Sequence, residues 1–198
     1  MQNRSHDTAS PADEKWKRRS ARNSGSRHAL FVFTAVLAAV VCLDAVTKLW
    51  ASVSLRESPI QVFPGFFVLD YVENTGVAFG LFQGHSGVLM ILSPLAFLFL
   101  AACLGWHTWD RGRRSTAIAC GMIVGGALGN VWSRLAHGYV IDFLDFLLYF
   151  PYIGSYDWPA FNLADSALCC GVVLFLFVSR SSACASTLPA DDHETSPD

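Results

Sequence analysis

Long apolar runs alternate with short polar segments along this chain. Four runs are long enough to be candidate membrane-spanning helices, at 29–50, 87–106, 115–134 and about 162–178. The first run would rise about 33 Å as a helix, which is enough to cross the hydrocarbon core of a bilayer. It is also too long for the apolar part of a cleavable signal peptide. The pattern predicts an all-α polytopic membrane protein with four transmembrane helices.

The two longer connections between these runs have patterns of their own. In the 51–86 connection, the stretch FFVLDYV follows a Pro-Gly pair and precedes Asn74-Thr75-Gly76. β-Branched and aromatic residues between turn signals are typical of strands, so we expect a small extracytoplasmic β-element here. The 136–161 connection is rich in aromatic residues that suit a membrane interface, namely Tyr149, Phe150, Tyr152, Tyr156, Trp158 and Phe161.

Composition supports a membrane protein and excludes a coiled coil or an ordinary soluble enzyme. Only 15% of the 198 residues are charged and 53% are hydrophobic, whereas soluble domains carry about 25% charged residues. Seven of the 14 Lys and Arg residues precede residue 28. We therefore expect a disordered basic tail over 1–28, a membrane domain over 29–179 and a second tail over 180–198. The basic residues form a tail rather than a nucleic-acid surface.

The distribution of Lys and Arg predicts the orientation in the membrane. The 107–114 connection holds three of them, the 51–86 connection one, and the 136–161 connection none. Loops rich in these residues stay in the cytoplasm. Both termini are thus expected to be cytoplasmic, and the two longer connections to face outward.

A stripe of small residues runs along the third apolar segment. Ala117, Gly121, Gly125 and Gly129 recur every four residues. Such a stripe lets a neighbouring helix approach closely. We expect a compact bundle.

Polar and ionisable residues occur where a membrane helix would disfavour them. They lie near the outer end of three of the predicted helices and in the segment between two of them, so four segments deliver polar groups to one leaflet. Ionisable residues inside a membrane are costly and mark functional sites. The candidates are Asp44, Lys48, Asn130, Arg134, Asp142, Asp145, Asn162 and Asp165.

Each candidate also has a purely structural interpretation. Asp44 and Lys48 are spaced to form an ion pair that only neutralises itself. Asn162 can cap a helix whose first turn contains Asp165. Asn130 and Arg134 can satisfy loop carbonyls, and Asp142 and Asp145 can lie on an exposed turn. We interpret Asp145, together with Asp70 and Asp157, as surface charges.

The residue types favour one chemistry. The sequence contains no Ser-His-Asp arrangement, no HExxH motif and no phosphate loop, and its six cysteines form no CxxC pair. Converging aspartates without a metal motif are typical of an aspartyl hydrolase. In such an enzyme two carboxyl groups share one proton, and the ionised group activates water.

The polar candidates all fall in three sequence blocks, and a fourth block follows the FFVLDYV stretch. The blocks are DAVTKLW at Asp44–Trp50, ENTGVAFG at Glu73–Gly80, GGALGNVWSRLAHGYVIDFLDF at Gly125–Phe146 and FNLADSA at Phe161–Ala167. These blocks resemble the bacterial lipoprotein signal peptidases (signal peptidase II), and the resemblance covers about residues 30–178. The 23-residue spacing between Asp142 and Asp165 also fits that family.

The resemblance implies four transmembrane helices, an outer β-rich element, and cleavage of prolipoproteins before a diacylglyceryl-modified cysteine. It implies an aspartic endopeptidase of the cell inner membrane that needs no cofactor or metal, with its active site near the outer leaflet. Its partners would be lipid-modified prolipoproteins and membrane lipid, and we expect a monomer. The catalytic aspartates fall on Asp142 and Asp165. The supporting positions fall on Asp44, Lys48, Asn74, Gly76, Asn130, Arg134 and Asn162.

The chain departs from the family at one position. Where the family usually reads GNxxDR, this sequence has Gly129–Arg134 with Ser133 in place of the aspartate. Without that neighbouring carboxylate, we expect Arg134 to be held by Asn130, by loop carbonyls or by a substrate oxygen.

Two other functions stay open at this point. The substitution at Ser133 would suit a noncatalytic paralogue that binds lipoproteins. Intramembrane acids also occur in ion-coupled transporters, although there they lie near the midplane and within inverted repeats.

Overall fold

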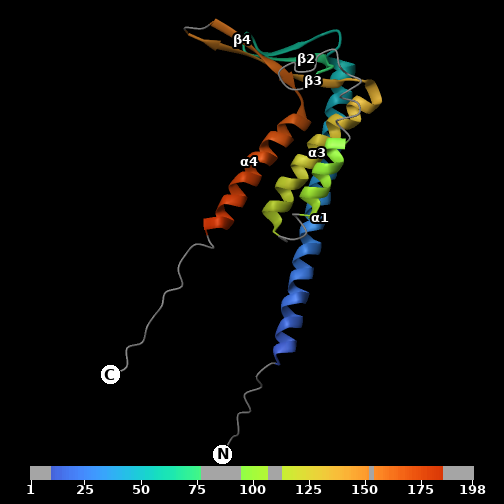
Figure 1. The fold of residues 1–198 in the computed structure, drawn as a ribbon. Coiled ribbons are helices and arrows are strands. Elements are labelled where there is room, and N and C mark those ends of the chain that lie inside the picture. The colour runs from blue at the N-terminus through green and yellow to red at the C-terminus, as the bar shows by residue number, and fades with distance from the viewer. Residues whose placement is uncertain (1–9, 77–94, 107–112, 152–153, 185–198) are drawn as a thin grey trace, which may run out of the picture.

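The computed structural model describes residues 10–76, 95–106, 113–151 and 154–184. The helices run side by side, and a sheet lies across one end of them (Figure 1). In chain order the elements are α1 (Pro11–Ser54), β1 (Ile60–Phe63), β2 (Phe67–Asn74), α3 (Arg114–His137), β3 (Val140–Phe150), β4 (Gly154–Phe161) and α4 (Leu163–Cys184). A shorter apolar helix, Leu95–Trp106, precedes α3.

Three of the described helices are long and apolar enough to cross a membrane, namely Ser24–Ser54, Arg114–His137 and Leu163–Arg180. They match the predicted spans at 29–50, 115–134 and 162–178. Of the predicted 87–106 span, residues 95–106 are helical, and residues 87–94 lie outside the described residues. The molecule is a multi-pass membrane protein with a small sheet.

The N-terminal segment differs from the disordered tail expected over 1–28. Helix α1 begins at Pro11 and continues without interruption into the apolar run. Proline is favoured in the first turn of a helix, and the Ala, Glu, Lys and Arg residues that follow are good helix formers. Lengthening an existing helix also avoids the cost of a new nucleus. The apolar helix therefore extends into the basic segment.

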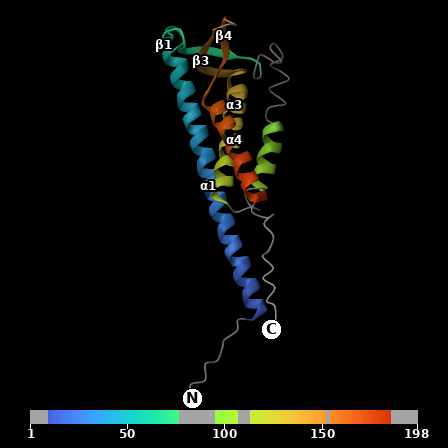
Figure 2. The same ribbon diagram turned by 90° about the vertical axis from the view of Figure 1, so that its left-hand side faces the viewer.

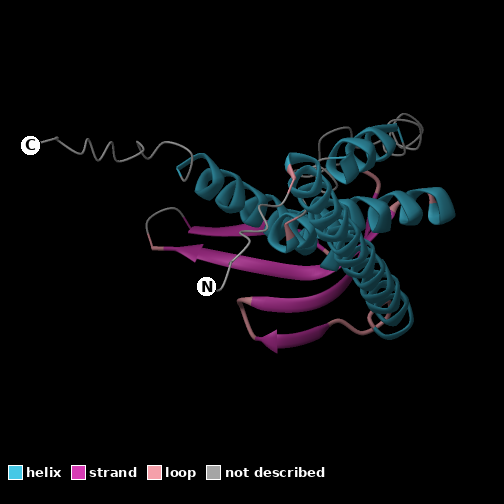
Figure 3. Ribbon diagram, turned by 90° about the horizontal axis from the view of Figure 1, so that it is seen from below, coloured by secondary structure: helices cyan, strands magenta, loops and turns pink. Residues whose placement is uncertain are grey.

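The sheet has four antiparallel strands in the order β1-β2-β3-β4. It extends to one side of the helices when the molecule is viewed along them (Figure 3). The β-element predicted in the 51–86 connection is confirmed as β1 and β2, joined at Gly65 with φ of 74°. The 136–161 connection, expected to be an aromatic interfacial loop, instead forms β3 and β4. Its aromatic and β-branched residues suit strands once β2 offers an edge to pair with.

The small-residue stripe brings α3 close to α1, as predicted. A Cβ added at Gly125 would lie 3.0 Å from Val40 Cβ and 3.1 Å from the Leu37 carbonyl oxygen. On the other side of α3, a Cβ added at Gly126 would clash with the Ala164 carbonyl oxygen of α4. Figure 2 shows the three helices lying close together beneath the sheet. Side chains from all three can therefore meet near that end.

Candidate active site

Asp142 lies near the start of strand β3, which follows α3 and crosses the ends of the helices. It is opposite Val72 in the β2–β3 pairing and is only 1% exposed. One carboxylate oxygen, Oδ2, accepts a hydrogen bond from Asn74 Nδ2 at 2.8 Å. The other, Oδ1, accepts one from Asn162 Nδ2 at 2.7 Å. The sheet thus delivers this carboxyl group to the helix bundle and satisfies both of its oxygens.

Asp165 lies in the first turn of α4, and Asn162 caps that helix. The Asp165 backbone N–H donates to Asn162 Oδ1 at 3.0 Å, and the Asn162 N–H donates to Asp165 Oδ2 at 3.2 Å. This reciprocal pair resembles a capping box. The remaining oxygen, Asp165 Oδ1, accepts a bond from Asn130 Nδ2 of α3 at 2.8 Å. The structural interpretation of these residues is therefore correct, and the same geometry orients the carboxyl group.

Asn162 joins the two aspartates. It is fully buried, and its side-chain Nδ2 donates to Asp142 while its backbone N–H donates to Asp165. Its Nδ2 also lies 3.1 Å from Asn130 Oδ1 and 3.3 Å from the Ile141 carbonyl oxygen. Two acids far apart in the sequence are thus held around one asparagine.

The buried ion pair of α1 is more than a self-neutralising pair. Lys48 Nζ donates to Asp44 Oδ2 at 2.8 Å and to Asn130 Oδ1 of α3 at 2.9 Å. Asp44 Oδ1 accepts the Ala164 N–H of α4 at 3.1 Å. The pair therefore links all three described long helices. Buried charges are stable only with such additional partners.

Arg134 is held by carbonyl oxygens, as expected. Its Nη2 donates to the Gly76 carbonyl at 3.2 Å and its Nη1 to the Asn130 carbonyl at 3.5 Å. Gly76 is itself held by its N–H, which donates to Asn74 Oδ1 at 2.9 Å. The arginine thus ties the end of β2 to α3, next to the asparagine that contacts Asp142.

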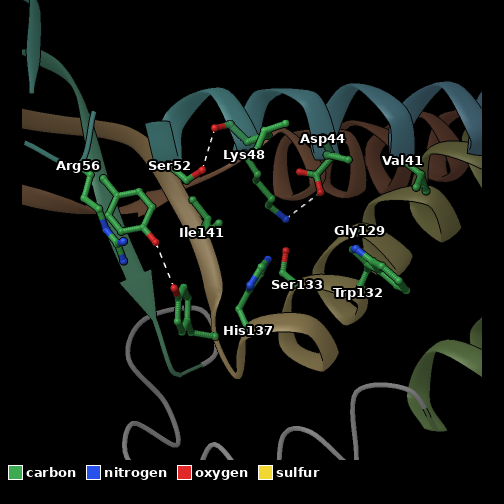
Figure 4. Close-up of a pocket in the computed structure, with 14 residues that line it drawn as sticks. Val41, Asp44, Lys48, Ser52, Arg56, Gly129, Trp132, Ser133, His137 and Ile141 are labelled. Atoms are coloured by element: carbon green, nitrogen blue, oxygen red, sulfur yellow. Dashed lines mark hydrogen bonds and ion pairs between the residues drawn. The ribbon is translucent and has the colours of Figure 1, made fainter. Parts of the chain in front are cut away.

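Ser133 is 3% exposed and lies on a side of α3 that faces α1. It lines a cavity of about 330 Å³ between α1, α3 and the sheet, together with Asp44 and Lys48. Figure 4 shows its hydroxyl group across a gap from Lys48. Neighbouring residues of a helix point in different directions, so an aspartate at 133 would face Lys48 rather than the Arg134 head group.

Sequence reasoning did not find the other polar residues of this cavity. Arg56 Nη2 donates to Glu73 Oε1 at 2.8 Å and its guanidinium lies over the Tyr71 ring at 5.0 Å. The hydroxyl oxygens of Tyr71 and Tyr139 are 3.2 Å apart. Arg56 is the one Lys or Arg residue of the 51–86 connection. This isolated charge is the sequence feature that could have drawn attention to it.

Asp145 stands apart from the site. Its backbone is opposite Val68, and its electrostatic neighbours are Asp157 and Asp70. Partial burial and these two charges raise the pKa of the Asp145 carboxyl. This position fits the interpretation of Asp145 as a surface charge and separates it from Asp142.

Burial is the main influence on the pKa of the Asp142 carboxyl. It raises the pKa of this carboxyl from 3.8 to about 6, and the nearby charge of Asp165 acts in the same direction. The hydrogen bonds from Asn74 and Asn162 oppose this rise because they stabilise the ionised form. A carboxyl group of this kind can hold or release a proton near neutral pH.

The charges of the cluster suggest one retained proton. Two cations, Lys48 and Arg134, face three carboxyl groups, those of Asp44, Asp142 and Asp165. One proton on the carboxyl groups would make the buried cluster neutral, which a low-dielectric site favours. Within the described ranges, no group of three His, Cys, Asp or Glu is arranged to hold a metal ion.

Solved structures and sequence relatives share this arrangement of the chain. A bacterial membrane enzyme aligns with a TM-score of 0.63 at 25% identity, covering 84% of this chain and 94% of that one. A second bacterial membrane enzyme aligns with a TM-score of 0.59 at 27% identity, covering 74% and 91%.

The sequence relatives are called lipoprotein signal peptidases. The protein from Alteromonas mediterranea is 42% identical over 127 residues, which is 63% of this chain and 66% of that protein. The protein from Beijerinckia indica is 38% identical over 168 residues, 80% of this chain and 93% of that protein. The family model for signal peptidase (SPase) II matches residues 36–180, which include every residue of the polar cluster. The chain belongs to the signal peptidase II family.

Proposed function

We propose that this protein is an aspartic endopeptidase that removes signal peptides from diacylglyceryl-modified prolipoproteins, cutting before the lipidated cysteine. The observation that carries the proposal is the pairing of Asp142 and Asp165 around Asn162, with bonds of 2.7 Å to one and 3.2 Å to the other. The names of the relatives supply the substrate class. The aspartic mechanism rests on the pair.

In this mechanism the two carboxyl groups share one proton. The ionised group takes a proton from a water molecule, which attacks the scissile carbonyl carbon. The protonated group donates a hydrogen bond to the carbonyl oxygen, and the tetrahedral intermediate then breaks at the C–N bond. The leaving amine receives the proton taken from the water. Asn74 and Arg134 lie beside the pair and would orient the substrate backbone or groups near the lipid.

We further propose that the protein is a monomer that crosses the inner membrane four times, with both termini in the cytoplasm. The basic N-terminal segment and the arginines of the 107–114 connection support this orientation. It puts the aspartates near the outer leaflet, where the lipid-modified part of a translocated precursor would lie. Apolar helix surfaces would hold the diacylglyceryl chains and the signal helix.

The rival functions have less support. A transporter would require acids near the membrane midplane, whereas Asp142 and Asp165 lie at the sheet end of the helices. A decayed paralogue would be expected to have lost one partner of the pair, yet both acids keep two N–H donors.

The test is cleavage of a lipidated precursor by the purified protein, with an unlipidated peptide as control. We expect the native protein to release the signal peptide only from the lipidated form. Asp142→Asn and Asp165→Asn should each lower the rate by about 10²–10⁴-fold, because asparagine cannot act as a base or share the proton. The double variant should be little worse than either single one, since the two groups act as a unit.

Asp145→Asn is the matched control, because it changes the neighbouring acid of the same strand and should leave the rate within a few-fold of native. Near-native cleavage by either catalytic variant would remove that residue from the mechanism. A native protein that binds lipidated precursors without cleaving any of them would identify the noncatalytic paralogue.

A further inference from the structure

Asn130 can contact Asp165 in two ways, and only one of them is favourable. An asparagine side chain has a donor end, Nδ2, and an acceptor end, Oδ1. Here the Nδ2 end donates to Asp165 Oδ1 at 2.8 Å. A rotation by 180° would turn the Oδ1 end toward the carboxylate and remove the bond. Something must therefore determine which end faces Asp165.

Two groups donate to the opposite end of the amide. Lys48 Nζ lies 2.9 Å from Asn130 Oδ1, and Asn162 Nδ2 lies 3.1 Å from it. Asn162 divides its two amide hydrogens among three acceptors. These are Asp142 Oδ1 at 2.7 Å, Asn130 Oδ1, and the Ile141 carbonyl oxygen at 3.3 Å. Lysine carries donors only. Of the two donors to Asn130 Oδ1, Lys48 is therefore the closer one, the charged one, and the one that can only donate.

Lys48 is itself held firmly in this position. It is almost completely buried, and its ion pair with Asp44 has a length of 2.8 Å. The Asp44 carboxylate is fixed in turn by the Ala164 N–H of α4 at 3.1 Å. A flipped Asn130 would turn its NH₂ group toward this ammonium group, which cannot accept a hydrogen bond.

We infer that Lys48 is a positioning residue that sets the amide orientation of Asn130 and thereby holds the Asp165 carboxyl group in place for catalysis. Lys48 acts through Asn130 and needs no contact with the substrate. This inference rests on the proposed function, because it gives the ion pair of α1 a role at the catalytic aspartates.

The test must separate this contact from the ion pair with Asp44. Removing Lys48 alone would leave Asp44 as an unpaired buried charge, which is strongly destabilising. The variants are therefore compared within an Asp44→Asn background, where no Lys48 variant leaves an unpaired carboxylate. In that background Lys48 can still donate to Asn130 and to the amide oxygen that replaces the carboxylate. The accumulation of the background protein in the membrane is measured first, because the background itself removes the counter-ion of Lys48. Lys48→Met removes the donor and keeps much of the volume, whereas Lys48→Gln restores an N–H donor without a charge. The readouts are kcat and KM for one lipidated precursor in one detergent.

We expect Lys48→Met to lower kcat by about 10- to 100-fold relative to the background, with KM changed by less than about threefold, because misplacing a catalytic group affects the chemical step. Lys48→Gln should recover most of the loss. In an additional Asn130→Ala variant, Lys48→Met should have no further effect, since the amide to be oriented is absent.

Three results would overturn the inference. They are an unchanged kcat in Lys48→Met, a loss that Lys48→Gln does not relieve, and an Asp44→Asn background already as slow as the double variant. If Lys48→Met does not accumulate in the membrane, Lys48→Gln decides alone, because a background-level kcat supports the inference and a large loss contradicts it. Failure of the proposed aspartic mechanism would appear separately, as near-native cleavage by Asp142→Asn or Asp165→Asn.

Discussion

Asp142 combines two properties that rarely occur together, namely near-complete burial and an ionisable group. Burial disfavours its charged form, and the two amide donors from Asn74 and Asn162 partly compensate for this effect. Desolvation is the larger influence, so the pKa lies at about 6 instead of 3.8. The two amide donors lower the pKa of Asp142, so removing one of them should raise it. This gives a test of whether Asp142 carries the proton that the pair is proposed to share.

Removing the donor at position 74 should make Asp142 hold its proton more tightly. Asn74→Leu keeps the approximate shape but cannot stabilise the ionised carboxylate, so the pKa of Asp142 should rise further. The pair loses activity when its shared proton leaves. The alkaline limb of the kcat/KM profile, which reports the free enzyme, should therefore start at about pH 6 or above in the native protein and shift to higher pH in Asn74→Leu.

The control is Asp145→Asn, because that acid lies outside the cluster and its removal should leave the limb where it is. A limb that moves to lower pH in Asn74→Leu would contradict the assignment of the amide as a donor to Asp142. A limb that does not move at all would show that Asp142 does not carry the titrating proton.

Helix α3 owes its position to small residues on two sides. A Cβ added at Gly125 would lie 3.0 Å from Val40 Cβ of α1, and one added at Gly126 would clash with the backbone of Ala164 in α4. Since α4 carries Asn162 at its cap and Asp165 in its first turn, the distance between α3 and α4 also determines whether Asn130 reaches Asp165. Packing and active-site geometry therefore depend on the same contact.

Gly126→Ala should push α4 away from α3, because its new methyl group would overlap the Ala164 carbonyl oxygen. Overpacking of this kind costs about 1–3 kcal/mol, and we expect a lower thermal midpoint in detergent together with a reduced cleavage rate. Gly105→Ala is the matched control, because no atom lies within 4 Å of an added Cβ there. That substitution should be neutral or slightly stabilising. Equal midpoints for the two variants would contradict the close α3–α4 contact.

The two ends of the helix bundle differ from each other. The sheet lies at one end, with Asp142 in β3 and Asp165 in the first turn of α4. The N-terminal end of α1 and the C-terminal end of α4 point away from the sheet (Figure 1). This arrangement puts the N-terminal end of α1 and the C-terminal end of α4 on the same side of the bundle. It agrees with the orientation proposed from the distribution of Lys and Arg.

Membrane orientation can be tested by cysteine labelling. Ser155 lies in β4, and a cysteine introduced by Ser155→Cys should react with an impermeant thiol reagent added to intact cells. A cysteine introduced by Gly112→Cys, in the 107–114 connection, should react only after the cells are permeabilised. The native cysteines are replaced or shown to be unreactive beforehand. Labelling of Gly112→Cys in intact cells, with Ser155→Cys protected, would reverse the proposed topology.

Local patterns in the sequence predicted what depends on local physics. Three of the four apolar runs are described as long helices, the Pro-Gly turn joins two strands, and the small-residue stripe marks a close helix contact. Asp142 and Asp165 are among the polar candidates of the sequence, and the resemblance to the family assigns them the catalytic role. Their shared contact with Asn162 is seen in the structure.

Long-range pairing was decided only by the tertiary structure. Strands β3 and β4 form because β2 offers an edge, and a segment read alone as an aromatic loop carries no sign of that partner. The direction of Ser133 toward Lys48, and the contact of Lys48 with an amide 82 residues away, depend on how α1 and α3 are rotated against each other. Hydrophobic periodicity determines which segments become helices, whereas side-chain packing between segments determines which polar groups meet.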